Sequence, residues 1–385
     1  MHILIAPNAF KNSLDAETAA KAIDKGLRES RLSCTTTIFP LGDGGDGTGD
    51  LLIRHSNGRI LQAIATDPLG RQISTVFGLI DKDKTAVIEL ARASGLSWLS
   101  VNEYDPLRTS TRGTGEMIKQ ALDLDVNKII LAIGGSATVD GGCGILETLG
   151  VRFLTQEGKV CKQLPGDLIT LDRIDLSGLD PRIANIELII LCDVENHLLG
   201  PLGAAAVYGP QKGASLEIIE NLEAGLARLS VVADKLTGKD MSNIEFGGAA
   251  GGVAAGLCVL INAKLVSGIE YFLDHTDFDR ALERTDLLIT AEGSIDGQTM
   301  RRKGPLGAAM RAKANGIPVI GIAGRVPLKT NGRLESFFDV ILPIGHEPME
   351  LQTALNTTSL NLVRTARGIG NLLGISGRPK FSNTL

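Results

Sequence analysis

The 385-residue sequence contains few cysteines, few aromatic residues and no excess of basic charge. Its five cysteines stand far apart and show no CxxC spacing, which argues against a disulfide framework and against a structural zinc site. They are Cys34, Cys143, Cys161, Cys192 and Cys258. Aromatic residues make up 4% of the chain and the net charge is −5, so neither base stacking nor a basic footprint for nucleic acid is indicated. We therefore expect small-molecule ligands.

Signals for export and for membrane insertion are also missing. The chain begins with an apolar strand, MHILIAP, rather than with a basic segment followed by a long apolar one. Residues 246–263 form an uncharged run, but the run contains five glycines and is better interpreted as a buried helix than as a membrane span. We expect a cytoplasmic protein that binds no membrane. The sequence leaves the oligomeric state open, a homodimer included.

Several familiar catalytic motifs are absent as well. The chain has no Walker A sequence, no HRD or DFG motif of protein kinases, and no G-x-S-x-G. Its five histidines, at positions 2, 55, 197, 275 and 346, are scattered, so no histidine-based catalytic cluster is predicted. Glycine, by contrast, is abundant, with 46 residues, and hydrophobic residues make up 43% of the chain. This composition favours well-buried sheets joined by loops that approach ligands closely.

Residues 128–144, KIILAIGGSATVDGGCG, combine these features in one stretch. An apolar strand over residues 128–133 leads into Gly134 and Gly135, and the hydroxyl side chains of Ser136 and Thr138 follow. A helix is predicted to begin after the glycines at 141–144, and Asp140 is assigned to capping it. A loop of this kind before a helix suits an anion such as phosphate. The alternative is an ordinary tight turn of an α/β protein.

A second glycine loop, GDGGDGTGD, follows the predicted strand TTTIFPL. Gly42, Gly44 and Gly47 satisfy the pattern G-x-G-x-x-G, but we reject a dinucleotide site because Asp43 and Asp46 would repel a pyrophosphate unless a cation intervened. Acidic residues beside phosphate indicate Mg²⁺. The alternative for this loop is simple capping of the following helix by an aspartate.

Other polar residues follow predicted strands or precede predicted helices. Ser110 and Arg112 precede a helix and could bind a carboxylate or a phosphate. The alternative is capping of that helix by Thr114, with Arg112 as a surface arginine. Asp193 ends a strongly apolar strand, where an ionised carboxylate is costly unless it meets water, metal or substrate. Three further candidates lie in similar loops: Lys11, Glu292 and Asp296.

The alternation of strands and helices predicts an α/β fold. We expect a Rossmann-like, doubly wound parallel-sheet domain formed by residues 1–65, 105–150 and 275–385. A charged turn at residues 81–84 joins two predicted antiparallel strands, which indicates a second, mixed α/β domain formed by residues 66–104 and 151–274. The active site is predicted in the cleft between the two domains.

Taken together, the loops resemble those of bacterial glycerate kinases of the type I family. Eleven segments occur in the same order as in that family: IAPNAFKNSL, LGDGGDGT, DPLGR, TSTRGTGE, IGGSATVDGG, LCDVEN, GPQKGAS, GGAAGG, SGIE, AEGSIDGQT and GIAG. The resemblance covers nearly the whole chain. It implies a two-domain kinase that uses ATP and Mg²⁺ to phosphorylate D-glycerate, with 2-phosphoglycerate as the usual product.

Within this resemblance we assign hypothetical roles, because phosphoryl transfer requires positioning and charge neutralisation above all. Gly134, Gly135, Ser136 and Thr138 would cradle phosphates, and Asp43 and Asp46 would hold Mg²⁺. Lys11 would neutralise the migrating phosphoryl group, and Asp193 or Asp296 would accept the proton of the glycerate hydroxyl. Ser110, Arg112 and Glu292 would bind glycerate.

The chain departs from the family pattern at three positions. Asn8 replaces a usual aspartate and cannot act as an acid, Val139 replaces a frequent asparagine, and His197 stands where the family has proline after Asn196. Alternatives to the 2-kinase are formation of 3-phosphoglycerate, phosphorylation of another small hydroxy acid, and a non-catalytic carboxylate-sensing regulator on the same fold.

Overall fold

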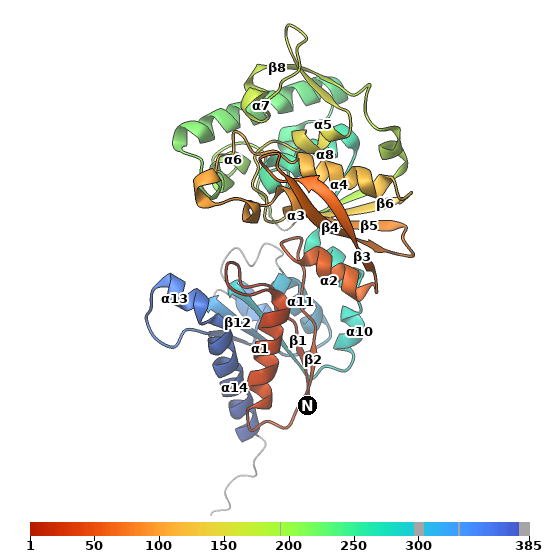
Figure 1. The fold of residues 1–385 in the computed structure, drawn as a ribbon. Coiled ribbons are helices and arrows are strands. Elements are labelled where there is room, and N and C mark those ends of the chain that lie inside the picture. Colours follow the sequence, from red (N-terminus) through yellow and green to blue (C-terminus); the bar gives the residue numbers. More distant parts are fainter. Residues whose placement is uncertain (193, 296–303, 330–331, 377–385) are drawn as a thin grey trace, which may run out of the picture. The chain divides into compact units, whose positions relative to one another are not determined.

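The structure, a computed structural model, describes residues 1–192, 194–295, 304–329 and 332–376. The chain divides into two compact units, one formed by residues 1–42 together with those from 272 onward, the other by residues 43–271. Each unit alternates strands and helices (Figure 1). One unit contains an all-parallel sheet and the other a mixed sheet, so the predicted fold class is confirmed.

The first unit is built on a five-stranded parallel sheet with the order β13-β12-β11-β1-β2. Its strands are β1 (His2–Ile5), β2 (Thr35–Ile38), β11 (Leu287–Ser294), β12 (Val319–Arg325) and β13 (Val340–Pro343). The strand order reverses between β1 and β11, because β1 continues to β2 on one side and β11 to β12 and β13 on the other. In parallel sheets such a reversal point is where ligands usually bind, at the carboxyl ends of the strands.

The helices of this unit are α1 (Ala16–Arg28), α10 (Phe278–Leu282), α11 (Gly304–Ala314), α12 (Gly332–Phe337), α13 (Leu351–Asn356) and α14 (Thr358–Ser376). Helix α1 begins at its cap Asp15, whose carboxylate accepts a hydrogen bond from Thr18 N. It lies directly against α14 (Figure 1). A side chain at Gly26 would stand 2.3 Å from the carbonyl oxygen of Val363, so this close approach of α1 and α14 requires glycine.

The second unit contains a six-stranded sheet with the order β10-β9-β6-β5-β4-β3. Its strands are β3 (Arg59–Thr66), β4 (Gln72–Ile80), β5 (Thr85–Glu89), β6 (Lys128–Ala132), β9 (Glu187–Cys192) and β10 (Lys264–Ser267). The pairs from β10 to β5 are parallel, and β4 and β3 continue the sheet in antiparallel fashion. The predicted antiparallel pairing of β4 with β5 around residues 81–84 is therefore confirmed.

The edge strand β3 is protected by side chains of helix α4 (Arg112–Leu122). Gln120 Nε2 donates to the carbonyl oxygen of Ile64 at 2.8 Å, and Thr66 N donates to a carboxylate oxygen of Glu116 at 2.7 Å. An exposed strand edge is a template for pairing with another chain. These two contacts occupy part of that edge.

Helices and a small hairpin complete the second unit. The hairpin pairs β7 (Arg152–Thr155) with β8 (Leu171–Asp175). The helices are α2 (Thr48–His55), α3 (Ala91–Ser94), α4 (Arg112–Leu122), α5 (Cys143–Thr148), α6 (Ala204–Tyr208), α7 (Leu216–Thr237) and α8 (Ala249–Ile261), and α9 (Gly268–Asp274) ends beyond residue 271. Short 3₁₀ turns include η5 (Pro210–Lys212). A single hydrophobic core joins residues from Ala63 to Ala263.

The structure corrects the predicted grouping of segments. Residues 105–150 were expected to join the sheet of the N-terminal strand, but their strand β6 pairs with β5 on one side and β9 on the other. Residues 43–65 likewise belong to the second unit, where β3 pairs with β4. A buried apolar strand specifies its own conformation but not its neighbour, because strand pairing joins residues far apart in sequence.

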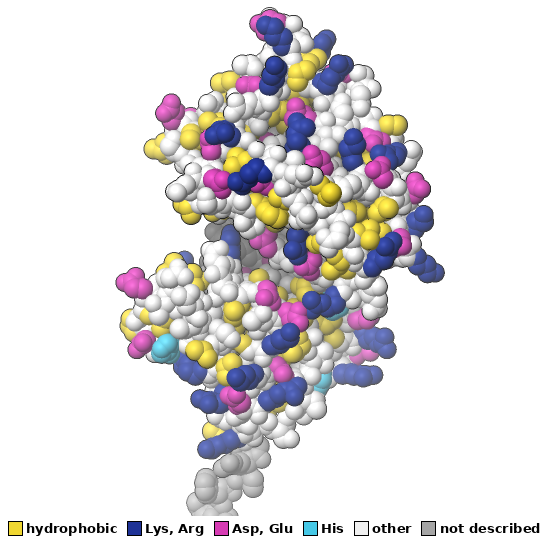
Figure 2. Space-filling model, in the orientation of Figure 1, with side chains coloured by type: hydrophobic (Ala, Val, Ile, Leu, Met, Phe, Trp, Pro, Cys, Tyr) yellow, Lys and Arg dark blue, Asp and Glu magenta, His cyan; other side chains and the backbone are white. Residues whose placement is uncertain are grey.

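Charged side chains of both signs are interspersed over the face shown in Figure 2. Of the helices within the described ranges, none combines the length and apolar character needed to cross a membrane.

Candidate active site

The acidic loop at residues 43–47 lies at the carboxyl ends of β6 and β9. Gly134 N, which follows β6, donates to the carbonyl oxygen of Gly44 at 3.1 Å. A side chain on Gly44 would stand 3.0 Å from the carbonyl oxygen of Leu191 in β9, and one on Gly134 would stand 2.5 Å from Cα of Gly45. The two predicted glycine loops therefore pack backbone to backbone, and glycine is required on both sides.

The two candidate metal ligands differ in their surroundings. Asp43 is buried, and its Oδ1 accepts a hydrogen bond from Gly45 N at 3.2 Å. Asp46 is exposed, and its Oδ1 lies 2.2 Å from the position that a Cβ on Gly135 would occupy. Asp46 therefore borders the predicted phosphate loop. Within the described part of the chain, no group of three or more His, Cys, Asp or Glu side chains is arranged to hold a metal ion.

Backbone hydrogen bonds hold the 134–138 loop in place, but two of its N–H groups take no part in them. Leu96 N donates to the carbonyl oxygen of Gly135, and Ala137 N donates to that of Ser94, both at 2.9 Å. In contrast, the N–H groups of Gly135 and Ser136 donate no hydrogen bond to any described residue. Gly135 has a φ of 71°, a left-handed conformation that favours glycine. Two successive unbonded N–H groups beside a left-handed glycine suit an anion.

A buried lysine that was not among the predicted site residues contacts this loop. Lys212 is 2% exposed, and its Nζ donates to Ser136 Oγ at 2.8 Å and to the carbonyl oxygen of Thr138 at 2.6 Å. The side chain of Thr138 is fully buried, and its Oγ1 has no hydrogen-bond partner. The sequence signal for Lys212 was its position between glycines in GPQKGAS, a segment noted only for its resemblance.

Ser110 and Arg112 lie at the start of α4, next to α5. Ser110 N donates to the carbonyl oxygen of Pro68 at 2.9 Å, and Arg112 is exposed and pairs with Glu147 on α5 at 3.4 Å. Burial raises the pKa of the Glu147 carboxyl to about 7, against the lowering effect of Arg112. The arginine therefore faces a carboxylate that titrates near neutral pH.

Asp140 accepts an N–H from the first turn of α5, as expected for helix capping, although Gly142 occupies the N-cap position. Its carboxylate accepts hydrogen bonds from Thr111 N at 2.8 Å, Thr111 Oγ1 at 2.7 Å, Gly142 N at 3.0 Å and Gly144 N at 3.2 Å. The residue is fully buried, and this burial raises the pKa of the carboxyl although all four hydrogen bonds lower it. Asp140 thus joins the beginnings of α4 and α5, a structural role.

In the first unit, Lys11 and Glu292 lie at the strand reversal point. Asn8 N, after β1, donates to the carbonyl oxygen of Ala291 in β11 at 2.7 Å. A side chain on Gly293 would stand 3.6 Å from Lys11 N, so the loop after β1 runs beside the end of β11. Lys11 is exposed and Glu292 is 6% exposed. The other two carboxylate candidates, Asp193 and Asp296, lie outside the described residues.

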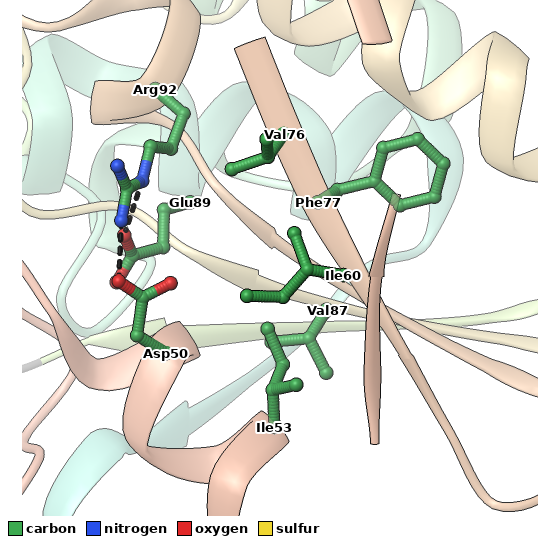
Figure 3. Close-up of a pocket in the computed structure, with 8 residues that line it drawn as sticks. All are labelled: Asp50, Ile53, Ile60, Val76, Phe77, Val87, Glu89 and Arg92. Atoms are coloured by element: carbon green, nitrogen blue, oxygen red, sulfur yellow. Dashed lines mark hydrogen bonds and ion pairs between the residues drawn. The ribbon is translucent and has the colours of Figure 1, made fainter. Parts of the chain in front are cut away.

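A small cavity lined by residues of α2, α3, β3, β4 and β5 is shown in Figure 3. In it, Arg92 of α3 points toward Asp50 of α2 and Glu89 at the end of β5, and it forms ion pairs with both. Glu89 Oε1 also accepts a hydrogen bond from Gly49 N at 2.8 Å, and burial, followed by the charge of Asp50, raises the pKa of Glu89. The cavity has a volume of about 10 Å³, enough for about one water molecule. It is too small to be a substrate site.

Asp67 lies 20 residues after Gly47, where the rejected dinucleotide interpretation would require an acidic residue to contact the ribose. Asp67 is buried, and its carboxylate accepts hydrogen bonds from Leu69 N and Arg71 N, both at 2.9 Å, and from Arg71 Nε at 2.5 Å. It is occupied in shaping the DPLGR turn.

Comparison with known proteins connects these loops to one family. The sequence profile described as "Glycerate kinase family" matches residues 3–374. A glycerate kinase of Bacillus subtilis (strain 168) is 41% identical over 369 residues, which cover 96% of this chain and 97% of that relative. A glycerate 2-kinase of Escherichia coli (strain K12) is 39% identical over 382 residues, covering 98% and 99%.

The fold is also similar to that of a crystal structure assigned to glycerate kinase 2 of Salmonella typhimurium LT2. The TM-score is 0.79 at 40% sequence identity, with 98% of this chain and 99% of the other covered.

Proposed function

Because the chain belongs to the glycerate kinase family, we propose that it transfers the γ-phosphoryl group of ATP to D-glycerate and forms 2-phosphoglycerate with Mg²⁺ present. The observation that carries this proposal is the 134–138 loop, in which the N–H groups of Gly135 and Ser136 have no partner within the described chain. The name of the Escherichia coli relative, a glycerate 2-kinase, supports phosphorylation of the 2-hydroxyl.

The loop is proposed to bind phosphate oxygens of ATP. Backbone N–H groups that are already held in place need little reorganisation when an anion binds. Such fixed donors are a main source of transition-state stabilisation in phosphoryl transfer. Gly134 and Gly135 keep the loop free of side chains, and the hydroxyl of Ser136 adds a donor. Thr138 is proposed to bind phosphate as part of the same loop, and its buried Oγ1 has no hydrogen-bond partner.

Asp43 and Asp46 are the residues proposed to hold Mg²⁺. Magnesium is usually bound through one or two carboxylates together with the phosphates of the substrate, so two aspartates of one loop are sufficient in number. Asp46 borders Gly135, which places a carboxylate next to the proposed phosphate site. The ion, when bound, would neutralise charge on the phosphate oxygens.

In the first unit, Lys11 is proposed to neutralise the migrating phosphoryl group, and Glu292 to contact glycerate. Their support is their location at the strand reversal point of a parallel sheet. Either Asp193 or Asp296 is proposed as the base that takes the proton of the glycerate hydroxyl. Replacing the base by asparagine should lower kcat by a factor of about 100 or more. Comparing D193N with D296N would assign the role.

Ser110 and Arg112 remain proposed ligands of the glycerate carboxylate. Arginine binds carboxylates well, and Arg112, whose side chain is half exposed, meets Glu147 only at 3.4 Å. Binding would exchange one carboxylate partner of Arg112 for another.

The test is release of ADP by the purified protein with ATP, Mg²⁺ and D-glycerate, followed by phosphorus NMR of the product. We expect glycerate-dependent ADP release and the signal of 2-phosphoglycerate. A 3-phosphoglycerate signal would correct the regiochemistry, and turnover only with another hydroxy acid would change the substrate. Binding of glycerate without any ADP release would favour a carboxylate-sensing regulator.

A further inference from the structure

The position of Lys212 is fixed by the backbone around it. The residue ends the 3₁₀ turn η5, and its N donates to the carbonyl oxygen of Gly209 at 2.9 Å. The next residue, Gly213, has a φ of 93°, and a side chain there would stand 2.5 Å from the carbonyl oxygen of Tyr104. The turn therefore tolerates only glycine after the lysine, and it directs a 2% exposed lysine into the unit.

The ammonium group determines how the hydroxyl of Ser136 is oriented. A lysine ammonium has three donors and no acceptor, so in the 2.8 Å contact the Ser136 oxygen must be the acceptor. The hydroxyl hydrogen of Ser136 is then directed away from Lys212 and can be donated to another group. Lys212 also donates to the carbonyl oxygen of Thr138 at 2.6 Å, which ties the end of the loop to the same cation.

Two further donors stand beside this hydroxyl in the chain. The N–H groups of Ser136 itself and of Gly135 have no acceptor among the described residues, whereas Gly134 N and Ala137 N are both bonded. The unbonded donors therefore belong to Ser136, whose hydroxyl Lys212 contacts, and to Gly135, the residue before it. Donors and positive charge gathered in this way favour an anionic oxygen.

We propose that Lys212 is a positioning residue of the phosphate site: it holds Ser136 as a hydrogen-bond donor toward a nucleotide phosphate, and its ammonium group lies next to Ser136 and Thr138. This inference rests on the proposed function, because the nucleotide is the ligand of that loop. Lys212 acts through Ser136 and through its charge, so its removal weakens nucleotide binding more than glycerate binding.

The experiment measures ATP affinity by calorimetry, without glycerate, for the wild type, K212M, K212R, S136A and K212M/S136A, together with KM for both substrates. We expect K212M to weaken ATP affinity by about 10-fold to 100-fold, and K212R to recover part of the loss because it retains charge and donors. The double variant should bind ATP about as weakly as K212M alone, since the two residues act as one unit. The KM for glycerate should change less than the KM for ATP.

The matched control is K128M. Lys128 begins β6, the strand that leads to the loop, and pairs with Glu187 at 3.3 Å at the opposite end of that strand. We expect K128M to bind ATP like the wild type. Unfolding curves recorded for every variant separate lost binding from lost folding.

The inference is overturned if folded K212M binds ATP like the wild type, or if the effects of K212M and S136A on affinity simply add. Should K212M not fold, S136A carries the test alone, because it leaves Lys212 in place. A folded S136A with unchanged ATP affinity then overturns the inference. If the wild type binds ATP but does not phosphorylate glycerate, the proposed function fails while the affinity measurements still decide the role of Lys212.

Discussion

Two neighbouring stretches, residues 134–138 and residues 140–144, share glycines and polar side chains but differ in how their polar groups are bonded. In the first stretch, the N–H groups of Gly135 and Ser136 have no acceptor in the described chain, and neither does Thr138 Oγ1 have a partner. In the second, the carboxylate of Asp140 accepts the N–H groups of Gly142 and Gly144. The first stretch therefore has polar groups without a partner in the described chain, and the polar groups of the second are hydrogen-bonded to one another.

The difference teaches that composition alone does not separate binding from stability. Buried polar groups are nearly always hydrogen-bonded in proteins, and within the 134–138 loop the buried Oγ1 of Thr138 departs from that rule, whereas Gly135 is exposed and its N–H is open to water or a ligand. The carboxylate of Asp140 accepts the N–H groups of Thr111, Gly142 and Gly144, so these donors need no ligand. Substitutions in the two stretches should accordingly affect different measurements.

The largest effect is expected at Asp140. Replacing it by Asn puts an amide hydrogen donor where a carboxylate oxygen now accepts, and leaves buried N–H groups without a partner, which should lower the free energy of unfolding by about 3 kcal/mol. Urea unfolding measures this loss. D46N, at an exposed position, is the control and should change the free energy by less than about 0.5 kcal/mol. Equal stability of D140N and the wild type would refute the structural role.

Gly135 should show a different pattern, in which a loss of ATP binding accompanies the loss of stability. Alanine at a φ of 71° costs about 1–2 kcal/mol, and its Cβ would stand 2.2 Å from Asp46 Oδ1. Because the alanine would move the aspartate or the loop, we expect G135A to raise the KM for ATP at least about 10-fold.

Gly158 provides the matched control for Gly135. It has a φ of 75°, but nothing lies within 4 Å of a Cβ placed there. G158A should therefore carry a similar backbone cost without any change in KM. If G135A and G158A have the same kinetics, the 134–138 loop does not bind the nucleotide.

Arg112 lies just outside both stretches, and its substitution tests whether the substrate site extends to α4. If its guanidinium binds the glycerate carboxylate, R112Q should raise the KM for glycerate by about 10-fold and leave the KM for ATP unchanged. R108Q, which replaces a nearby exposed arginine, is the control. An unchanged KM for glycerate would leave Arg112 with Glu147 as a surface ion pair.

The smallest effect concerns the pH dependence of stability at Glu147. Its pKa in the folded protein, about 7, is raised above the ordinary 4.5, so folding favours the protonated form. The contribution to stability is present below about pH 4.5 and is lost as the pH rises through 7. For a side chain that is still 18% exposed, we expect a loss of about 1 kcal/mol. Urea unfolding of E147Q between pH 5 and pH 8 should lack this dependence, and a slope equal to that of the wild type would contradict it.

Local sequence was sufficient to predict much of the fold. The strand at Lys128, the turn at residues 81–84 and the capping role of Asp140 follow from hydrophobic runs, charged turns and residues before helices, and the structure contains all three. These features depend on neighbours within a few residues. Patterns that span only a few residues therefore predicted these local structures correctly.

Long-range pairing could not be predicted in the same way. The partners of β6 begin at residue 85 on one side and residue 187 on the other, and Lys212 contacts a serine 76 positions earlier. The hydrophobic pattern of β6 shows that the strand is buried but does not identify its partner strands, because β6 would be equally buried in either sheet. For the same reason the glycine-flanked Lys212 could be noticed in the sequence but not placed at the loop.

Hydrogen exchange of single backbone amides, recorded with and without saturating ATP, tests the contrast between the two stretches most directly. The account predicts that the amides of Gly135 and Ser136 exchange readily in the free protein and become protected when ATP is added, whereas those of Gly142 and Gly144 are protected in both states. Unchanged exchange at Gly135 and Ser136 in the presence of bound ATP would contradict it.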